Sequence, residues 1–79
     1  MSTHLEQLVD IMATNFDLDP ADLAADTVLA DLELDSLVLE ELSVIMERRF
    51  GVRLAGGELR PELTVGQVAA LAAGESVTV

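Results

Sequence analysis

The chain of 79 residues contains no cysteine, so its fold must be stabilised without covalent or thiolate-metal cross-links. Disulfides, thiolate zinc sites and cysteine nucleophiles are all excluded. The single histidine, His4, also excludes histidine-cluster metal sites and most catalytic triads. A domain of this size buries only roughly 60–65% of the surface of its unfolded chain, so its stability depends on a modest hydrophobic core. The sequence predicts one domain over residues 1–79, ordered over about residues 3–74, with a disordered tail at 75–79.

The charge of the chain limits its partners. Fifteen acidic residues against four arginines and no lysine give a formal net charge of −11, and residues 1–35 carry nine acids and no arginine. Nucleic acid is a poor partner because phosphate binding needs clustered cations, and anionic membrane surfaces are disfavoured for the same reason. Basic protein surfaces would attract such a chain. The same acidity also serves plain solubility.

Membrane insertion and export are not indicated. No apolar run reaches the roughly 18–20 residues of a membrane helix. The first six residues lack the basic start and the apolar core of a signal peptide. We expect a soluble cytoplasmic protein with no membrane association.

The first part of the chain predicts one helix and a long loop. Apolar residues recur with a helical period from about Thr3 to Asn15, and Thr3 and Glu6 fit a capping box. Asp19 followed by Pro20 then indicates a capped helical turn. The chain up to Asp35 has no helical period, but apolar anchors are spread along it: Leu18, Leu23, Val28, Leu29, Leu32 and Leu34. Loops of this length in small domains tend to be functional.

The second predicted helix runs from Ser36 to Phe50, with Asp35 as its N-cap and Gly51 as its left-handed stop. At about 100° per residue, one stripe of this helix is apolar and faces the core. It consists of Leu39, Leu42, Met46 and Phe50, with Ile45 beside it. The opposite stripe mixes apolar and charged residues and points outward. It consists of Leu37, Glu41, Val44 and Arg48.

The last part of the chain predicts a third main helix. Gly56 and Gly57 break the chain, and residues 58–60 are expected to form one turn before Pro61. Thr64 and Gln67 fit a second capping box, which opens a helix that runs through Ala73 and ends at Gly74. The predicted fold is therefore an all-α bundle of three main helices, with a short third helix or turn and a long loop between the first two helices.

No constellation in the sequence builds an active site. A calcium loop that begins at Asp17 would need Gly and Glu where Asp22 and Val28 stand. Ser36 has neither the glycines of a nucleophile elbow nor a histidine placed to act as its base. The acids at positions 31, 33 and 35 alternate with leucines, and we interpret them as the outer side of a half-buried loop rather than a metal site. The sequence predicts that the chain is not an enzyme and holds no metal.

One motif survives this search, at the point where the acidic loop becomes the second helix. Residues 35–37 read Asp-Ser-Leu, and Asp31-Leu32 and Glu41-Leu42 flank them. Phe50-Gly51-Val52 closes the helix, and residues 63–66 read Leu-Thr-Val-Gly. Over roughly residues 5–73, this pattern resembles the acyl carrier proteins of fatty-acid and polyketide synthesis.

The resemblance implies a covalent cofactor. Ser36 would be the attachment point of 4′-phosphopantetheine, which a separate phosphopantetheinyl transferase takes from coenzyme A. Acyl groups would then be carried as thioesters on the terminal thiol of this arm. Asp35 would cap the helix and also contact the arm or its Mg²⁺ during transfer. The position agrees with elementary electrostatics, because a phosphodiester at a helix N-terminus lies near unpaired N–H groups and the positive end of the dipole.

The resemblance also implies a docking surface on the second helix. Partner enzymes with basic docking surfaces, such as a ketosynthase and other acyl-processing enzymes, would bind a monomer there. The residues expected to take part are Leu37, Glu40, Glu41, Val44, Glu47 and Arg48.

The chain departs from the family pattern in several places. Glu33 stands where Gly is common, Val38 where an acidic or polar residue is frequent, and Arg48 where an acid is frequent. Pro61 is expected to shorten the family's small third helix. We interpret these departures as those of a discrete carrier of a bacterial polyketide pathway. The alternatives are a fatty-acid synthesis carrier and, in a different class, an unmodified acidic adaptor.

Overall fold

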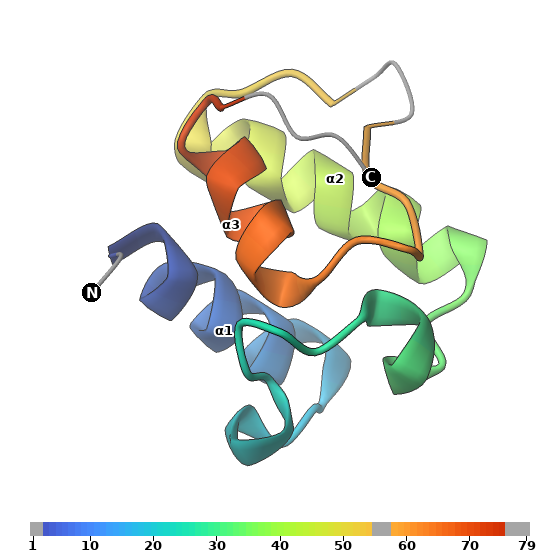
Figure 1. Cartoon of the computed structure of the whole chain (residues 1–79). Coiled ribbons are helices and arrows are strands. Elements are labelled where there is room, and N and C mark those ends of the chain that lie inside the picture. The colour runs from blue at the N-terminus through green and yellow to red at the C-terminus, as the bar shows by residue number, and fades with distance from the viewer. Residues whose placement is uncertain (1–2, 55–57, 76–79) are drawn as a thin grey trace.

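A computed structural model describes residues 3–54 and 58–75 of the chain. The described residues form helices and contain no strand; one isolated antiparallel bridge joins Val28 to Thr64. Helix α3 packs against α1, and α2 lies on the other side of α3 (Figure 1). In chain order, the elements are α1 (Thr3–Phe16), the 3₁₀ helices η1 (Pro20–Asp22) and η2 (Leu29–Leu32), α2 (Ser36–Phe50) and α3 (Val65–Ala72). The predicted all-α bundle is confirmed.

Helix α2 has the predicted bounds, and both of its ends have local causes. The backbone of Asp35 is extended, and its Oδ1 accepts a hydrogen bond of 2.9 Å from the Val38 N–H. Gly51 takes a φ of +70° and donates its N–H to the Glu47 carbonyl over 3.0 Å. Glycine adopts this left-handed conformation without steric cost, and so ends the helix there.

Helix α3 begins and ends with standard capping motifs. The Thr64 hydroxyl accepts the Gln67 N–H, and the Gln67 side chain accepts the Thr64 N–H, so the predicted capping box is confirmed. The last α-helical residue is Ala72, one residue earlier than predicted. Gly74, with a φ of +84°, donates to the Leu71 carbonyl, and Glu75 donates to the Ala70 carbonyl. This pair of bonds is a Schellman motif, in which a left-handed glycine satisfies the last carbonyls of the helix.

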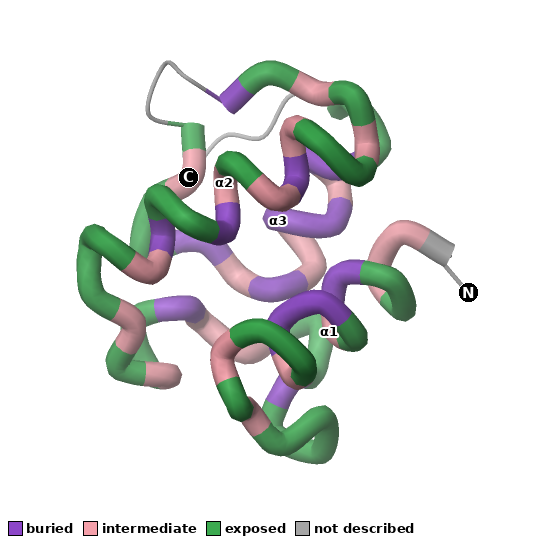
Figure 2. Tube along the Cα trace, turned by 180° about the vertical axis from the view of Figure 1, so that it is seen from behind, coloured by how far each residue is buried: buried purple, intermediate pink, exposed green. Residues whose placement is uncertain are grey.

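The core lies where the three α-helices meet, and it is wholly apolar among the described residues. Figure 2 shows buried stretches alternating with exposed ones along α1 and α2, whereas α3 is buried or half-buried along its whole length. The inner stripe of α2 is confirmed, although Phe50 and Ile45 are only partly buried against the core. The long loop contributes Leu23 and Leu29. The buried residues are Leu8, Ile11, Met12, Leu23, Leu29, Leu39, Leu42, Met46, Leu54, Leu63, Val65, Val68, Ala69, Leu71 and Ala72.

The loop between α1 and α2 contains one predicted turn and one that the sequence did not predict. Asp19 caps η1 as expected, since its Oδ1 accepts the Ala21 N–H over 2.9 Å. The second 3₁₀ helix, η2, falls where no helical period is present. Four residues of 3₁₀ helix are too short to leave a period in the sequence, so the only signals there were the apolar anchors Leu29, which is buried, and Leu32.

The expected turn over residues 58–60 was placed too early. The described chain has no helical turn there; the turn forms one step later, where the Leu63 N–H donates to the Arg60 carbonyl over 3.1 Å. Pro61 explains the shift, because proline disfavours a helical conformation in the residue before it and suits the second position of a turn. The break at Gly56–Gly57, the Thr3 side chain of the proposed capping box and residues 76–79 of the predicted disordered tail 75–79 lie outside what the structure describes. Glu75, the first residue of that tail, is described, and its N–H donates to the Ala70 carbonyl.

A set of backbone hydrogen bonds ties the long loop to the start of α3. The N–H groups of Leu29 and Ala30 donate to the carbonyls of Leu63 and Pro61, each over 2.9 Å. In the return direction, the Val65 and Gly66 N–H groups donate over 2.8 Å to the carbonyls of Thr27 and Ala25. We call these four bonds the latch. They fix the loop that leads into α2.

The latch predicts an unusual response to Gly66→Ala. Alanine normally stabilises a helix relative to glycine by about 1 kcal/mol. Here the added Cβ would lie 2.9 Å from the Ala25 carbonyl oxygen, which is backbone held by the latch. We therefore expect a loss of about 1–3 kcal/mol in the free energy of unfolding, measured by urea denaturation. A stabilised Gly66→Ala variant would contradict the close approach.

Candidate functional site

The candidate site begins at the N-terminus of α2, where Ser36 is the first helical residue and is exposed. The first N–H groups of a helix have no acceptor within it. The Asp35 carboxylate satisfies the N–H of Val38, and the Leu39 N–H opens the helical ladder by donating to the Asp35 carbonyl over 3.1 Å. The N–H groups of Ser36 and Leu37 lie before that ladder. The Ser36 hydroxyl thus stands at the positive end of a 15-residue helix.

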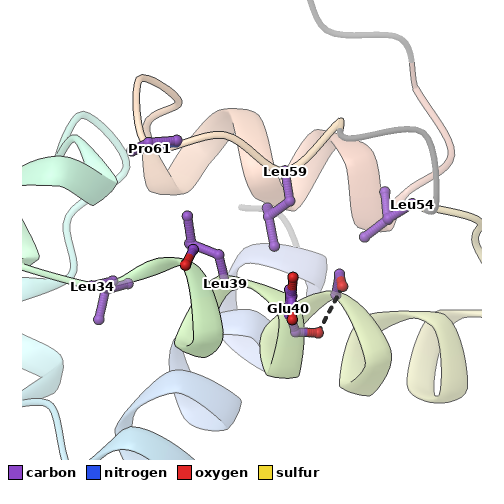
Figure 3. A pocket seen from close by; sticks show the side chains of 8 residues that line it. Leu34, Leu39, Glu40, Leu54, Leu59 and Pro61 are labelled. Carbon is purple, nitrogen blue, oxygen red and sulfur yellow. Dashed lines mark hydrogen bonds between the residues drawn. The ribbon is translucent and has the colours of Figure 1, made fainter.

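A cleft of about 470 Å³ opens beside Ser36. One wall is α2, and the other is the segment that passes over it after the chain reverses. Figure 3 shows Leu59 on this segment, with its side chain pointing toward α2. The lining residues are Leu34, Ser36, Leu39, Glu40, Ser43, Leu54, Leu59 and Pro61. A cleft lined by four leucines, with a hydroxyl at its rim, can shelter a slender, partly apolar chain that is anchored on that hydroxyl.

The outward face of α2 is exposed, as the sequence predicted. Leu37 and Val44 are 62% and 49% exposed, and they are the two large apolar residues that are exposed among those described. Together with Glu40, Glu41 and Ile45 they line an open hollow of about 400 Å³. We call this set of five residues the docking hollow. Arg48 is also exposed, one helical turn beyond Val44.

Glu47 has a partner that the sequence did not indicate. Its side chain is half-buried, and its Oε2 accepts a hydrogen bond of 2.8 Å from the Leu54 N–H. Because Leu54 belongs to the cleft wall, Glu47 holds that wall against the end of α2. The bond forms only after the chain reverses at Gly51, so no local pattern could have predicted it. The same applies to Leu59 and Pro61, whose place in the cleft depends on the same reversal.

The acids before Ser36 lie on the solvent side of the loop. Asp31, Glu33 and Asp35 are exposed, while the leucines between them are half-buried, which confirms the predicted alternation. Across the described residues, no three histidine or acidic side chains come together in a way that could hold a metal ion. None of the described helices has the length and apolarity needed to cross a membrane.

Glu33 occupies a strained position close to the site. Its φ of +57° and ψ of +35° are left-handed, which costs a non-glycine residue about 1–2 kcal/mol. We expect Glu33→Gly to raise the free energy of unfolding by about 0.5–1 kcal/mol, because the greater freedom of glycine in the unfolded chain cancels part of the gain. Urea denaturation measures the change. Asp26→Gly, which removes the same charge from an exposed turn without a positive φ, should lower stability, and equal losses in both variants would refute the argument.

Comparison with known proteins agrees with this geometry. The family described as "Phosphopantetheine attachment site" matches residues 6–73. The chain is 44% identical over 55 residues to polyketide-8 synthase acyl carrier protein 2 of Streptomyces avermitilis, a match that covers 68% of this chain and 63% of that protein. It is 40% identical over 75 residues to the non-reducing polyketide synthase spyA of Aspergillus fumigatus, which covers 94% of this chain and 4% of that protein.

The match therefore spans less than two thirds of the length of either relative. No solved structure matches the chain significantly. The family match extends over most of the chain and includes α2 and α3 in full and α1 from Glu6 onward. The chain belongs to the phosphopantetheine attachment-site family, and its prosthetic group is a covalently attached phosphopantetheine.

Proposed function

We propose that this protein is an acyl carrier protein of polyketide synthesis and that phosphopantetheine is attached to the Oγ of Ser36. The observation that carries the proposal is the placement of Ser36, exposed at the start of α2 and at the rim of an apolar cleft. Both relatives are named for polyketide synthesis, which supports the choice of pathway. A fatty-acid synthesis carrier would use the same site.

The residues around Ser36 fit the group. The phosphodiester would lie at the positive end of α2, where unpaired N–H groups favour an anion. When attached, the group supplies a terminal thiol, on which acyl chains are carried as thioesters. Leu34, Leu39 and the far wall of the cleft would shield an apolar chain from water. The protein itself contributes position, electrostatics and shelter.

The proposal assigns activation of Ser36 to the transferase. The only histidine of the chain is His4, whose ring packs against Phe50 with the ring centroids 5.7 Å apart, at the other end of α2. A 15-residue helix separates that contact from Ser36 by about 20 Å. Asp35 already accepts the Val38 N–H, but its carboxylate is exposed and has further acceptor capacity toward the arm or its Mg²⁺ during transfer.

We further propose that partner enzymes bind the outward face of α2. The candidate residues are Leu37, Glu40, Glu41, Val44 and Arg48, while Glu47 supports the face through its bond to Leu54. The partners are the phosphopantetheinyl transferase, a ketosynthase and other acyl-processing enzymes. An exposed apolar hollow rimmed by carboxylates suits a basic surface with one protruding apolar side chain.

Charge reversal within the docking hollow tests this assignment. Glu41→Lys should weaken association with a polyketide ketosynthase by about fivefold to tenfold at low salt and by less at high salt, because screening reduces the contribution of an exposed charge. Dissociation constants at two salt concentrations measure the effect. Asp10→Lys, an equal change of charge at an exposed residue of α1, is the control. Equal affinities for Glu41→Lys and the parent protein at both salt concentrations would exclude this face.

The proposal has the protein acting as a monomer in the cytoplasm, without nucleic acid. Fifteen acids against four arginines repel phosphate backbones, which supports the last point. A monomer suits a protein that must present the same serine to several enzymes in turn.

Intact mass is the direct test of the carrier function. The purified protein is weighed before and after incubation with coenzyme A, Mg²⁺ and a broad-specificity phosphopantetheinyl transferase. We expect a gain of one phosphopantetheinyl unit. No gain, from a protein shown to be folded and not already modified, would favour an unmodified acidic adaptor instead.

A further inference from the structure

The charges of the chain are divided at the end of α2. Residues 1–47 hold twelve of the fifteen acids and no arginine, whereas all four arginines lie at or after position 48. Arg48 and Arg49 form the last turn of α2, and both are exposed. The outer side of this helix therefore carries carboxylates in its first half and guanidinium groups in its last turn.

Arg48 lies in line with the docking hollow, whereas Arg49 does not. Residues Leu37, Val44 and Arg48 lie on one side of α2 because their spacings of seven and four residues return to the same face. Arg49 is rotated from that line by about 100°. In Figure 2, the exposed stretches of α2 recur along its length up to this end. One exposed face thus presents the docking hollow, with Leu37 at its start and Glu40 and Glu41 inside it, and then the cation of Arg48 one turn beyond Val44.

Apart from their position at the helix end, Arg48 and Arg49 make no polar side-chain interaction with the other described residues. Among residues 3–54 and 58–75, neither guanidinium forms an ion pair or hydrogen bond with another side chain. The helix dipole favours a cation in the last turn, but it favours Arg48 and Arg49 equally. The dipole therefore explains why the turn is basic, and not why a cation lies in line with Leu37 and Val44.

The two charged ends are far enough apart to be recognised separately. Glu41 and Arg48 are seven residues apart, which corresponds to about 10 Å along the helix axis. This separation exceeds the Debye length of about 8 Å at physiological salt. A partner group close to one of the two charges is therefore largely screened from the other. Both still fit within the footprint of one partner, about 800 Å² per side.

We propose that the docking partner has a bipolar surface: a cation opposite Glu40 and Glu41, an apolar side chain in the docking hollow, and a carboxylate opposite Arg48. This inference rests on the proposed docking function of α2 and adds a direction to it. A partner that bound with the helix reversed would bring like charges together at both ends, which is strongly disfavoured. Arg48 thereby fixes which way α2 lies and so directs Ser36 toward the partner's active site.

The test uses two charge reversals of equal size. Arg48→Glu and Arg49→Glu each make the protein more acidic by two charges and remove the same interaction with the helix dipole. The probe is a polyketide ketosynthase that binds the parent protein, and the dissociation constant of each phosphopantetheinylated variant is measured at low salt. We expect Arg48→Glu to raise it by about fivefold to tenfold. Arg49→Glu should leave it within about twofold, and Arg48→Lys should preserve binding.

The alternative predicts the opposite sign. If the partner were attracted only by acidity, Arg48→Glu would bind as tightly as the parent or more tightly, and that result would overturn the bipolar surface while Glu41→Lys still weakened binding. Equal losses for Arg48→Glu and Arg49→Glu, accompanied by equal losses of thermal stability, would also overturn it and indicate a role in helix stability. If Arg48→Glu and Glu41→Lys are both without effect on binding, the docking function of α2 itself fails.

Discussion

Ser36→Ala is expected to abolish phosphopantetheine attachment while the protein stays folded. The variant removes the only atom proposed to form the phosphodiester bond, so its intact mass should not change on incubation with coenzyme A, Mg²⁺ and the transferase. Stability should change by at most about 1 kcal/mol, because Ser36 is exposed, the cap is Asp35 rather than Ser36, and alanine is a good helix former. Circular dichroism and a urea titration measure the fold.

The cleft provides a matched control for this experiment. Ser43 lines the same cleft, and its hydroxyl donates to the Glu40 carbonyl over 2.7 Å. Ser43→Ala therefore removes a hydroxyl from the same surface and the same helix, and it should be modified as fully as the parent protein. A gain of one phosphopantetheinyl unit by Ser36→Ala would disprove attachment at Ser36. A loss of modification in both variants would indicate that the cleft surface, rather than one hydroxyl, is required.

Leu42→Ala should cause the largest loss of stability on α2. The Leu42 side chain is 0% exposed at the centre of the inner stripe. Truncating a leucine in such a place costs about 3–5 kcal/mol, out of a total stability of about 5–15 kcal/mol for an average domain. For a domain of this size, that corresponds to a fall of about 15–30 °C in Tm, measured by thermal denaturation.

Val44→Ala, two residues further along the same helix, separates stability from docking. Its side chain is 49% exposed, so its truncation should change the free energy of unfolding by no more than about 0.5 kcal/mol. It should instead weaken binding of the ketosynthase, since it removes part of the docking hollow. Leu42→Ala should still accept phosphopantetheine at temperatures where it is folded. Similar stability losses in the two variants would mean that the outward face contributes to the core.

Local signals predicted most of the fold. The bounds of α2 follow from Asp35 and Gly51, whose cap and left-handed stop act within one helical turn of the residues themselves. The capping box of Thr64 and the stop at Gly74 gave α3 to within one residue. These features could be predicted because each depends on residues that are neighbours in the chain.

Contacts that depend on chain reversal could not be predicted. The bond from Leu54 to Glu47, the far wall of the cleft and the latch all join segments that meet only in the folded state. The helix η2 is too short to have a period, and Pro61 moved the expected turn by one step. For the candidate site, the sequence predicted that Ser36 starts a helix and that Leu37 and Val44 point outward, and both placements are confirmed. The roles of these residues stay predictions.

The latch has a topological consequence. Its bonds from Leu29 to Leu63 and from Ala30 to Pro61 bring the two ends of the segment 30–62 together. Every candidate functional feature lies between those ends: the serine, the cleft and the outward face of α2. The chain is thus divided into a closed excursion and a support made of α1 and α3. The segment 30–62 could therefore be grafted between related carriers as one unit. The graft would succeed where α1 and α3 of the recipient pack against the inward side chains of Leu39, Leu42 and Met46.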